Sequence, residues 1–300
     1  MPGASHTTSR LEWRNTLRGW LYVSPFMAIF LLFTAIPAAI AFVYSFTDMG
    51  LADIRRPLEV SFTFLDTFRK VLTNVGFLKS LGTTAIFVVI GVPLTMVLGL
   101  VLALALNSGI TRLKALYRSA FYLPVITNVV AAAVIWQYAF TLGGPVNTLL
   151  AQMGLGGPNW LGDPTLATGT VIMLTVWRNV GTCMVLFLAG LQAIPSDVYE
   201  ASALDGASRW QRLVQITLPL LKPATLLVSV LMTVSYMNIF DEPYLLTKGG
   251  PVGATRSVAL WVYEQFGHGN IAAAMAGSYV MLAIVAVLGI VQLRMLRSAQ

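Results

Sequence analysis

Long apolar runs constrain this chain more than any other feature. The stretches at 20–46 and 81–106 contain no charged residue, and further apolar runs follow. A helix that crosses about 30 Å of hydrocarbon needs about 20 such residues, and in lipid only helices and closed barrels satisfy their own backbone polar groups. The chain is 57% hydrophobic and 10% charged, with a mean hydropathy of +0.76, which exceeds what a soluble core needs. We predict an all-α integral membrane protein.

Six runs of this kind are predicted as transmembrane spans of one domain, residues 19–298. They lie at about 20–46, 81–106, 120–142, 166–191, 223–246 and 272–293. Residues 1–18 form a basic arm, and the long first run predicts an uncleaved anchor instead of a cleavable signal peptide. The segment SFTFLDTFRKVL at 61–72 predicts a short surface helix between the first two spans.

The net charge of +7 is a topology signal. The lysines and arginines of the chain lie mostly between the apolar runs, so we expect a lipid bilayer and not nucleic acid as the partner. Both termini and the polar loop after the fourth span are placed in the cytoplasm, because this puts most lysines and arginines there. The segment at 47–80 fits the rule least well, since it holds several basic residues on the outer side.

The polar loop after the fourth span has the pattern of two short helices. Asp197 is predicted to cap the first helix, and Glu200, three residues on, to complete a capping box. Gly206 stands where a helix usually ends with a left-handed residue. Ser208 is predicted to cap the second helix, and Pro219 to stop it. A rigid helical pair of this size indicates a docking surface.

The same loop resembles the EAA loop in permease subunits of bacterial ATP-binding-cassette importers. The matching residues are Glu200-Ala201-Ser202, then Asp205-Gly206-Ala207, then Ile216-x-Leu218-Pro219. Ser202 replaces the usual second alanine, and Leu213 the usual phenylalanine. Further matching stretches lie at 91–107, 121–136, 187–202, 240–251 and 272–280. Together they resemble the carbohydrate-uptake branch, on the side of the maltose permease's larger subunit but without its large periplasmic domain.

The resemblance implies a fold, a location and partners. The fold is the type I (MetI-like) permease fold, with six transmembrane helices and cytoplasmic EAA coupling helices over 196–223. The location is the bacterial cytoplasmic (inner) membrane. The implied partners are a second homologous permease, two copies of a cytoplasmic ATPase and an extracytoplasmic solute-binding protein. ATP is expected to bind to the ATPase and no cofactor to this chain, which has no Gly-rich phosphate loop with its lysine. The predicted ATPase-coupling residues are Glu200, Ala201, Ser202, Asp205, Gly206 and Ala207.

Polar and aromatic residues inside the spans predict a solute pathway, because such groups are costly in lipid. A sugar site needs hydrogen-bonding groups and an aromatic face. The predicted pathway residues are Asn128, Trp177, Arg178, Asn179, Tyr236, Asn238 and Asp241. In the maltose-type relative, an aromatic side chain matching Trp177 and polar groups matching 236–239 line the sugar site. Ile239 and Thr182 depart from that pattern, which implies a different solute.

Structural roles remain open for the same residues. Arg178 either contacts solute or pairs with Asp241 or a partner subunit, and Trp177 either stacks on solute or fills space. The side chains of Asn128 and Asn238 alternatively form hydrogen bonds between helices. Glu200 is alternatively only a capping residue.

The function predicted is that of a permease subunit of an ATP-driven importer for a sugar or sugar-like solute. No catalytic or metal-binding cluster is apparent, so we do not predict an enzyme. The alternative is an ion-coupled secondary transporter or channel without an ATPase. It is disfavoured because it has no use for a helical docking loop and because no acidic residue is expected in the middle of a span. A non-transporting scaffold is disfavoured by the polar residues at one depth.

Overall fold

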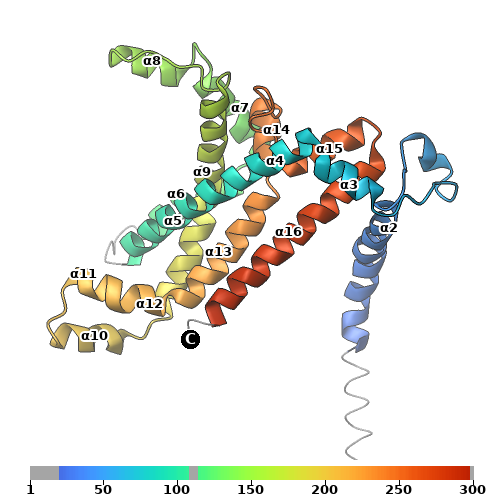
Figure 1. The fold of residues 1–300 in the computed structure, drawn as a ribbon. Coiled ribbons are helices and arrows are strands. Elements are labelled where there is room, and N and C mark those ends of the chain that lie inside the picture. Colours follow the sequence, from blue (N-terminus) through green and yellow to red (C-terminus); the bar gives the residue numbers. More distant parts are fainter. Residues whose placement is uncertain (1–19, 108–113, 298–300) are drawn as a thin grey trace, which may run out of the picture.

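The computed structural model describes residues 20–107 and 114–297 (Figure 1). The predicted basic arm at 1–18 lies outside the described residues. Within the described ranges every regular element is a helix, apart from one isolated bridge between Thr47 and Phe62. The predicted all-α membrane fold is confirmed.

Five helical runs in the described ranges are long and apolar enough to cross a membrane, and a bent pair provides a sixth. The pair consists of Arg209–Leu220 and Lys222–Met237, which meet at 65°. The five single runs are Trp20–Tyr44, Val75–Asn107, Val129–Gln152, Pro164–Gln192 and Ile271–Met295.

The long runs contain several shorter elements. The first ends in α2 (Ile36–Tyr44), and the second joins α4 (Val75–Ile86) to α5 (Val92–Asn107). The other main helices are α6 (Lys114–Ile126), α7 (Val129–Phe140), α9 (Pro164–Gln192), α13 (Lys222–Met237) and α16 (Ile271–Arg297). The shorter helices are α3 (Asp66–Thr73), α8 (Pro145–Gln152), α10 (Ser196–Leu204), α11 (Arg209–Gln211), α12 (Leu218–Leu220), α14 (Asp241–Thr247) and α15 (Val258–Gly267).

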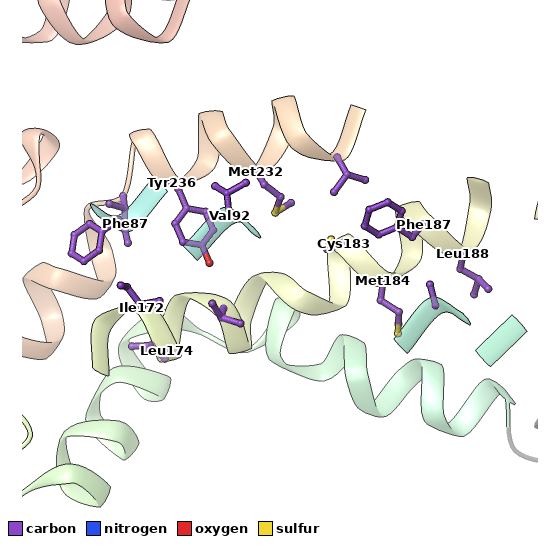
Figure 2. Close-up of a cluster of buried hydrophobic side chains, with 14 of the residues drawn as sticks. Phe87, Val92, Ile172, Leu174, Cys183, Met184, Phe187, Leu188, Met232 and Tyr236 are labelled. Atoms are coloured by element: carbon purple, nitrogen blue, oxygen red, sulfur yellow. The ribbon is translucent and has the colours of Figure 1, made fainter. Parts of the chain in front are cut away.

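Helix α9 is the centre of the packing. It contacts α5, α6, α13 and α14, and its buried side chains form the main core with those of α5 and α13 (Figure 2). Small residues allow the close approach. A Cβ at Gly181 would lie 2.5 Å from the backbone oxygen of Phe121, so only glycine fits where α9 crosses α6. In lipid, helix association depends on such packing because the hydrophobic effect is absent there.

The first helix stands apart from the rest of the chain in Figure 1. It contacts α16 near its end, where the rings of Phe42 and Tyr279 lie 5.0 Å apart and the Tyr279 hydroxyl donates to the carbonyl of Ala38. None of its most apolar window is buried within the chain. The surface is therefore left to lipid or to another subunit.

The third predicted span is two helices instead of one. Helix α6 ends at Ile126, and α7 begins at Val129. The Asn128 side chain accepts from the amides of Val130 (2.8 Å) and Ala131 (3.4 Å), which satisfies two orphan donors of the new helix. The apolar pattern conceals this cap because hydropathy is continuous across it.

The fifth predicted span is also broken. Helix α13 ends at Met237, and α14 begins at Asp241. Pro243 has no N–H to donate to the carbonyl four residues earlier, that of Ile239. The Ser257 hydroxyl donates to this carbonyl instead, at 2.6 Å. A residue distant in sequence thus stabilises the break, which the local pattern does not reveal.

Candidate functional site

A polar cavity of about 250 Å³ lies where α9, α13, α14 and the end of α6 meet. Most of its lining side chains carry hydrogen-bonding or charged groups. They are Thr175, Arg178, Asn179, Ser235, Asn238, Asp241 and Glu242, together with Val125, Ile239 and Phe240. A concave site with convergent polar groups is the usual form of a small-molecule site.

An ion pair crosses this cavity. Arg178 Nη1 on α9 and Glu242 Oε1 on α14 lie 2.5 Å apart, and their side chains are 22% and 8% exposed. Of the alternatives left open for Arg178, pairing with Asp241 does not occur, and its partner is Glu242. The break before α14 is the reason, because it resets the helical register and directs Glu242 inward.

Four of the seven predicted pathway residues line the cavity: Arg178, Asn179, Asn238 and Asp241. The Asn179 and Asn238 amide nitrogens donate to backbone carbonyls four residues earlier, each at 2.9 Å. Among the described residues, no group donates to either amide oxygen. These two side chains therefore keep their amide oxygens as unused hydrogen-bond acceptors in the cavity.

The other three predicted residues do not line the cavity. Tyr236 is fully buried in the main core, where its hydroxyl is 2.7 Å from Thr95 Oγ1 (Figure 2). Asn128 is the cap of α7 described above. Trp177 is 37% exposed, and its ring lies 5.9 Å from that of Trp136.

Sequence analysis missed three polar residues of the cavity: Thr175, Ser235 and Glu242. Thr175 lies four residues before Asn179, and Ser235 lies three residues before Asn238, so helical spacing points to both. Glu242 is next to a residue that was selected. Its role was hidden because the start of α14 is not visible in the sequence.

The second candidate site is the loop at 196–223, which we call the coupling loop. Helix α10 ends in a turn with Gly206 at φ +75°, as predicted. The Gly206 amide donates to Ala203 O (3.1 Å), and the Ala207 amide donates to Ser202 O (3.0 Å). These two bonds define a Schellman motif, which satisfies the last carbonyls of the helix.

The second half of the coupling loop begins as predicted but ends differently. Ser208 and Gln211 form a reciprocal capping box at α11. Pro219 does not stop the helix, because residues 212–217 widen into a π-helical turn and α12 continues to Leu220. Within that turn the Thr217 hydroxyl donates to Arg212 O at 3.1 Å.

The predicted caps of α10 are wrong. Helix α10 begins after Pro195 without a side-chain cap, so neither Asp197 nor Glu200 forms a capping box. Proline in this region already sets a backbone angle suited to a helix start. Glu200 is exposed, which removes its purely structural interpretation as a cap.

The coupling loop presents a mixed polar and apolar surface. Of the predicted coupling residues, Glu200, Ala201, Asp205 and Gly206 are exposed, Ala207 is half-buried, and Ser202 is buried with its hydroxyl donating to Tyr199 O at 2.8 Å. Beside the glycine turn, Leu204 is 90% exposed and Trp210 is 71% exposed. The prediction omitted Leu204. Its flanking position, one residue before Asp205-Gly206, was the available signal.

The fold and these sites define a polytopic helical transport component of a membrane. The chain belongs to the family of binding-protein-dependent transport system inner membrane components, whose model matches residues 95–297. It is thus a multi-pass inner-membrane permease and not an enzyme. Within the described residues, no group of three or more histidines, cysteines or acids is arranged to hold a metal ion.

Several relatives are similar over nearly the whole chain. A probable ABC transporter permease protein, YesP, of Bacillus subtilis is 36% identical, covering 94% of this chain and 91% of the relative. The trehalose/maltose transport system permease protein MalF of Thermococcus litoralis is 33% identical, with 97% of each covered. The lactose transport system permease protein LacF of Rhizobium radiobacter is 32% identical, covering 95% and 97%.

The fold is shared with a solved importer. A chain of a bacterial alginate ABC transporter, crystallised with an alginate-bound periplasmic protein, superposes with a TM-score of 0.81 at 20% identity. The match covers 95% of this chain and 97% of that one. At this identity the likeness establishes the permease fold alone.

Proposed function

We propose that this chain is the permease subunit of an ATP-driven importer for a sugar or sugar-like solute. Relatives named for lactose and for trehalose/maltose transport support the solute class. The proposed assembly contains a second homologous permease, two copies of an ATPase that binds the ATP, and an extracytoplasmic solute-binding protein. The alginate transporter solved with its periplasmic protein supports the last of these.

The solute is proposed to pass through the polar cavity. Hydroxyl groups of a sugar would bond to the acceptors of Asn179 and Asn238, and the half-buried Phe240 supplies an aromatic face on the same wall. Trp177 and Tyr236 do not belong to this path in the conformation described.

The coupling loop is proposed to dock on the ATPase. The single observation that carries this role is an apolar side chain left in solvent on a rigid turn: Leu204, 90% exposed, next to the Schellman motif at Gly206. Burying one such side chain on a partner stabilises a complex by about 1.5–3 kcal/mol. Trp210, on the other side of the turn, provides a second anchor of the type enriched at interfaces.

The arrangement in Figure 1 supports a cytoplasmic location for both termini. The coupling loop, the start of the first helix and the end of α16 lie at one end of the molecule, and α8, α14 and α15 lie at the other (Figure 1). If the coupling loop meets a cytoplasmic ATPase, the chain ends share its side of the membrane.

Alternating access follows from rigid-body motion. Closure of an ATPase dimer on ATP would move two docked coupling loops, one in each permease. The 65° bend between α12 and α13 joins the loop directly to a helix that lines the cavity. A small movement at the loop is thereby transmitted as a rotation of packed helices.

The test is co-purification of the ATPase with tagged permease variants. We expect Leu204→Asp with Trp210→Ala to lose most of the ATPase, because the apolar anchors are removed and a charge is added. The matched control is Val252→Asp, which places the same charge at a residue 92% exposed in the segment between α14 and α15. Undiminished recovery of the ATPase with the double variant would refute docking through this surface.

A further inference from the structure

The charged residues of the polar cavity do not balance. Three charged side chains line it: Arg178, Asp241 and Glu242. Arg178 and Glu242 neutralise each other at 2.5 Å. Asp241 is exposed, and none of the ion pairs among the described residues includes it. The cavity wall contributed by this chain therefore carries one net negative charge.

We infer that Asp241 makes the solute cavity select neutral or cationic sugars, such as amino sugars, over anionic ones such as uronates. The inference rests on the proposed function, in which this cavity is the solute path. It names the substrate class by charge and assigns the selection to one residue.

Arg178 does not offset this selection. An anionic solute could pair with the Arg178 guanidinium only by displacing Glu242, whose side chain is 8% exposed. That exchange would leave a buried carboxylate without its partner, which is strongly unfavourable. The Arg178 Nε has no hydrogen-bond partner among the described residues, but the atom is buried and not open to a solute.

The remaining polar groups of the cavity are neutral. Thr175, Asn179, Ser235 and Asn238 contribute hydroxyls and amides, which suit sugar hydroxyls of any stereochemistry but do not distinguish charge. Discrimination by charge therefore falls to Asp241. An ammonium group on a solute would gain a direct partner there, and a carboxylate would meet a like charge.

The size of the effect follows from Coulomb's law. For unit charges roughly 6 Å apart in a partly hydrated cavity, with an effective dielectric constant of about 40, the interaction corresponds to about a tenfold change in affinity. The affinities of the cavity for a cationic and an otherwise identical anionic probe then differ by up to about 100-fold.

The rates at which charged thiol reagents modify a cysteine in the cavity measure the electrostatic potential there. Cys183 is the sole cysteine of the chain and is buried, so Cys183→Ala gives a clean background for Asn238→Cys on the cavity wall. In the assembled transporter we would compare modification by trimethylammonioethyl and sulfonatoethyl methanethiosulfonates, each rate divided by its rate with a free thiol. We expect the cationic reagent to be favoured by tenfold or more, and Asp241→Asn to reduce that ratio at least about tenfold.

The matched control is Asp163→Asn. It removes one carboxylate at the start of α9, where the Asp163 side chain caps the helix, and asparagine caps equally well. We expect it to leave the ratio unchanged. Asp241→Ser is a second charge-removing variant, and co-purification with the ATPase shows that each variant is folded. A ratio unaffected by both Asp241 variants, or shifted equally by Asp163→Asn, would overturn the inference.

Uptake distinguishes this inference from the proposed function. Radiolabelled maltose, its glucosamine analogue and its glucuronate analogue are tested in proteoliposomes with the complete transporter before and after full modification of Asn238→Cys. If the reagent ratios change as expected but modification does not reduce uptake of any transported sugar, the negative charge stands and the cavity is not the solute path. If modification blocks uptake but the glucuronate analogue is transported best, the selection inference fails and the pathway stands.

Discussion

The turn at Gly206 provides a graded test of coupling. Gly206 has φ +75°, and a Cβ there would meet nothing within 4 Å, so the backbone angle alone determines which residues fit. Asparagine enters this left-handed region readily, alanine costs about 1–2 kcal/mol, and proline is held near φ −65°. Proline also loses the bond from the Gly206 amide to Ala203 O (3.1 Å).

These costs predict an order of effects. A cost of 1–2 kcal/mol lowers the population of the native turn relative to alternatives by a factor of about 5–30. If the turn positions Leu204 for the ATPase, solute uptake per ATP hydrolysed should fall slightly for Gly206→Asn, further for Gly206→Ala and almost completely for Gly206→Pro. The assay is uptake and ATP hydrolysis in the same proteoliposomes, with permease content measured in each.

A matched glycine on another part of the chain separates coupling from stability. Gly154 after α8 also has φ +75°, also meets nothing within 4 Å, and donates its amide to Ala151 O at 3.0 Å. The same three substitutions there carry the same backbone cost. They should change stability alone and leave the uptake-to-hydrolysis ratio intact. Normal coupling by Gly206→Pro, or equal uncoupling by Gly154→Pro, would refute the reasoning.

Two further predictions concern packing inside the membrane domain, and thermal unfolding in detergent measures both. Arg178→Met or Glu242→Leu alone should each lower the free energy of unfolding by about 3–5 kcal/mol, because a buried charge loses its partner. The double variant should recover most of that loss. A double variant as unstable as the single variants would contradict this. Gly181→Ala should cost about 1–3 kcal/mol, because its Cβ would lie 2.5 Å from Phe121 O, while Gly169→Ala on the same helix, with nothing within 4 Å, should be neutral or stabilising. Equal melting temperatures for the two alanine variants would contradict this, because they would show that α6 moves away from the added Cβ at little cost in stability.

Much of the candidate coupling site could be predicted from the sequence because its geometry is local. The left-handed Gly206 and the Ser208 cap depend on residues within one helical turn, and both predictions are confirmed. The Asp197 cap failed for a local reason as well, since the helix starts after Pro195, two residues earlier than the pattern suggested. The position of Leu204 beside the turn suggested a role, but its exposure was not predictable, because exposure depends on which surfaces the rest of the chain leaves uncovered.

The polar cavity was only partly predictable. Arg178, Asn179, Asn238 and Asp241 were selected because polar groups in lipid are costly, and all four line it. Tyr236 was selected by the same criterion, but it is fully buried and bonded to Thr95, a residue 141 positions away in sequence. Polarity identifies a residue that needs a partner and does not say whether the partner is a solute or another helix.

The sequence by itself determined the class of the protein and the approximate course of its spans, because bilayer thickness sets the length of every apolar run and backbone hydrogen bonding in lipid demands helices. Only the tertiary structure decided where those helices break. Ser257 satisfies the carbonyl that Pro243 leaves open, so α13 ends at Met237 and α14 begins in a new register. That register turns Glu242 toward Arg178 and leaves Asp241 in the cavity without an ion-pair partner among the described residues. The direction of a side chain after a break depends on contacts distant in the chain.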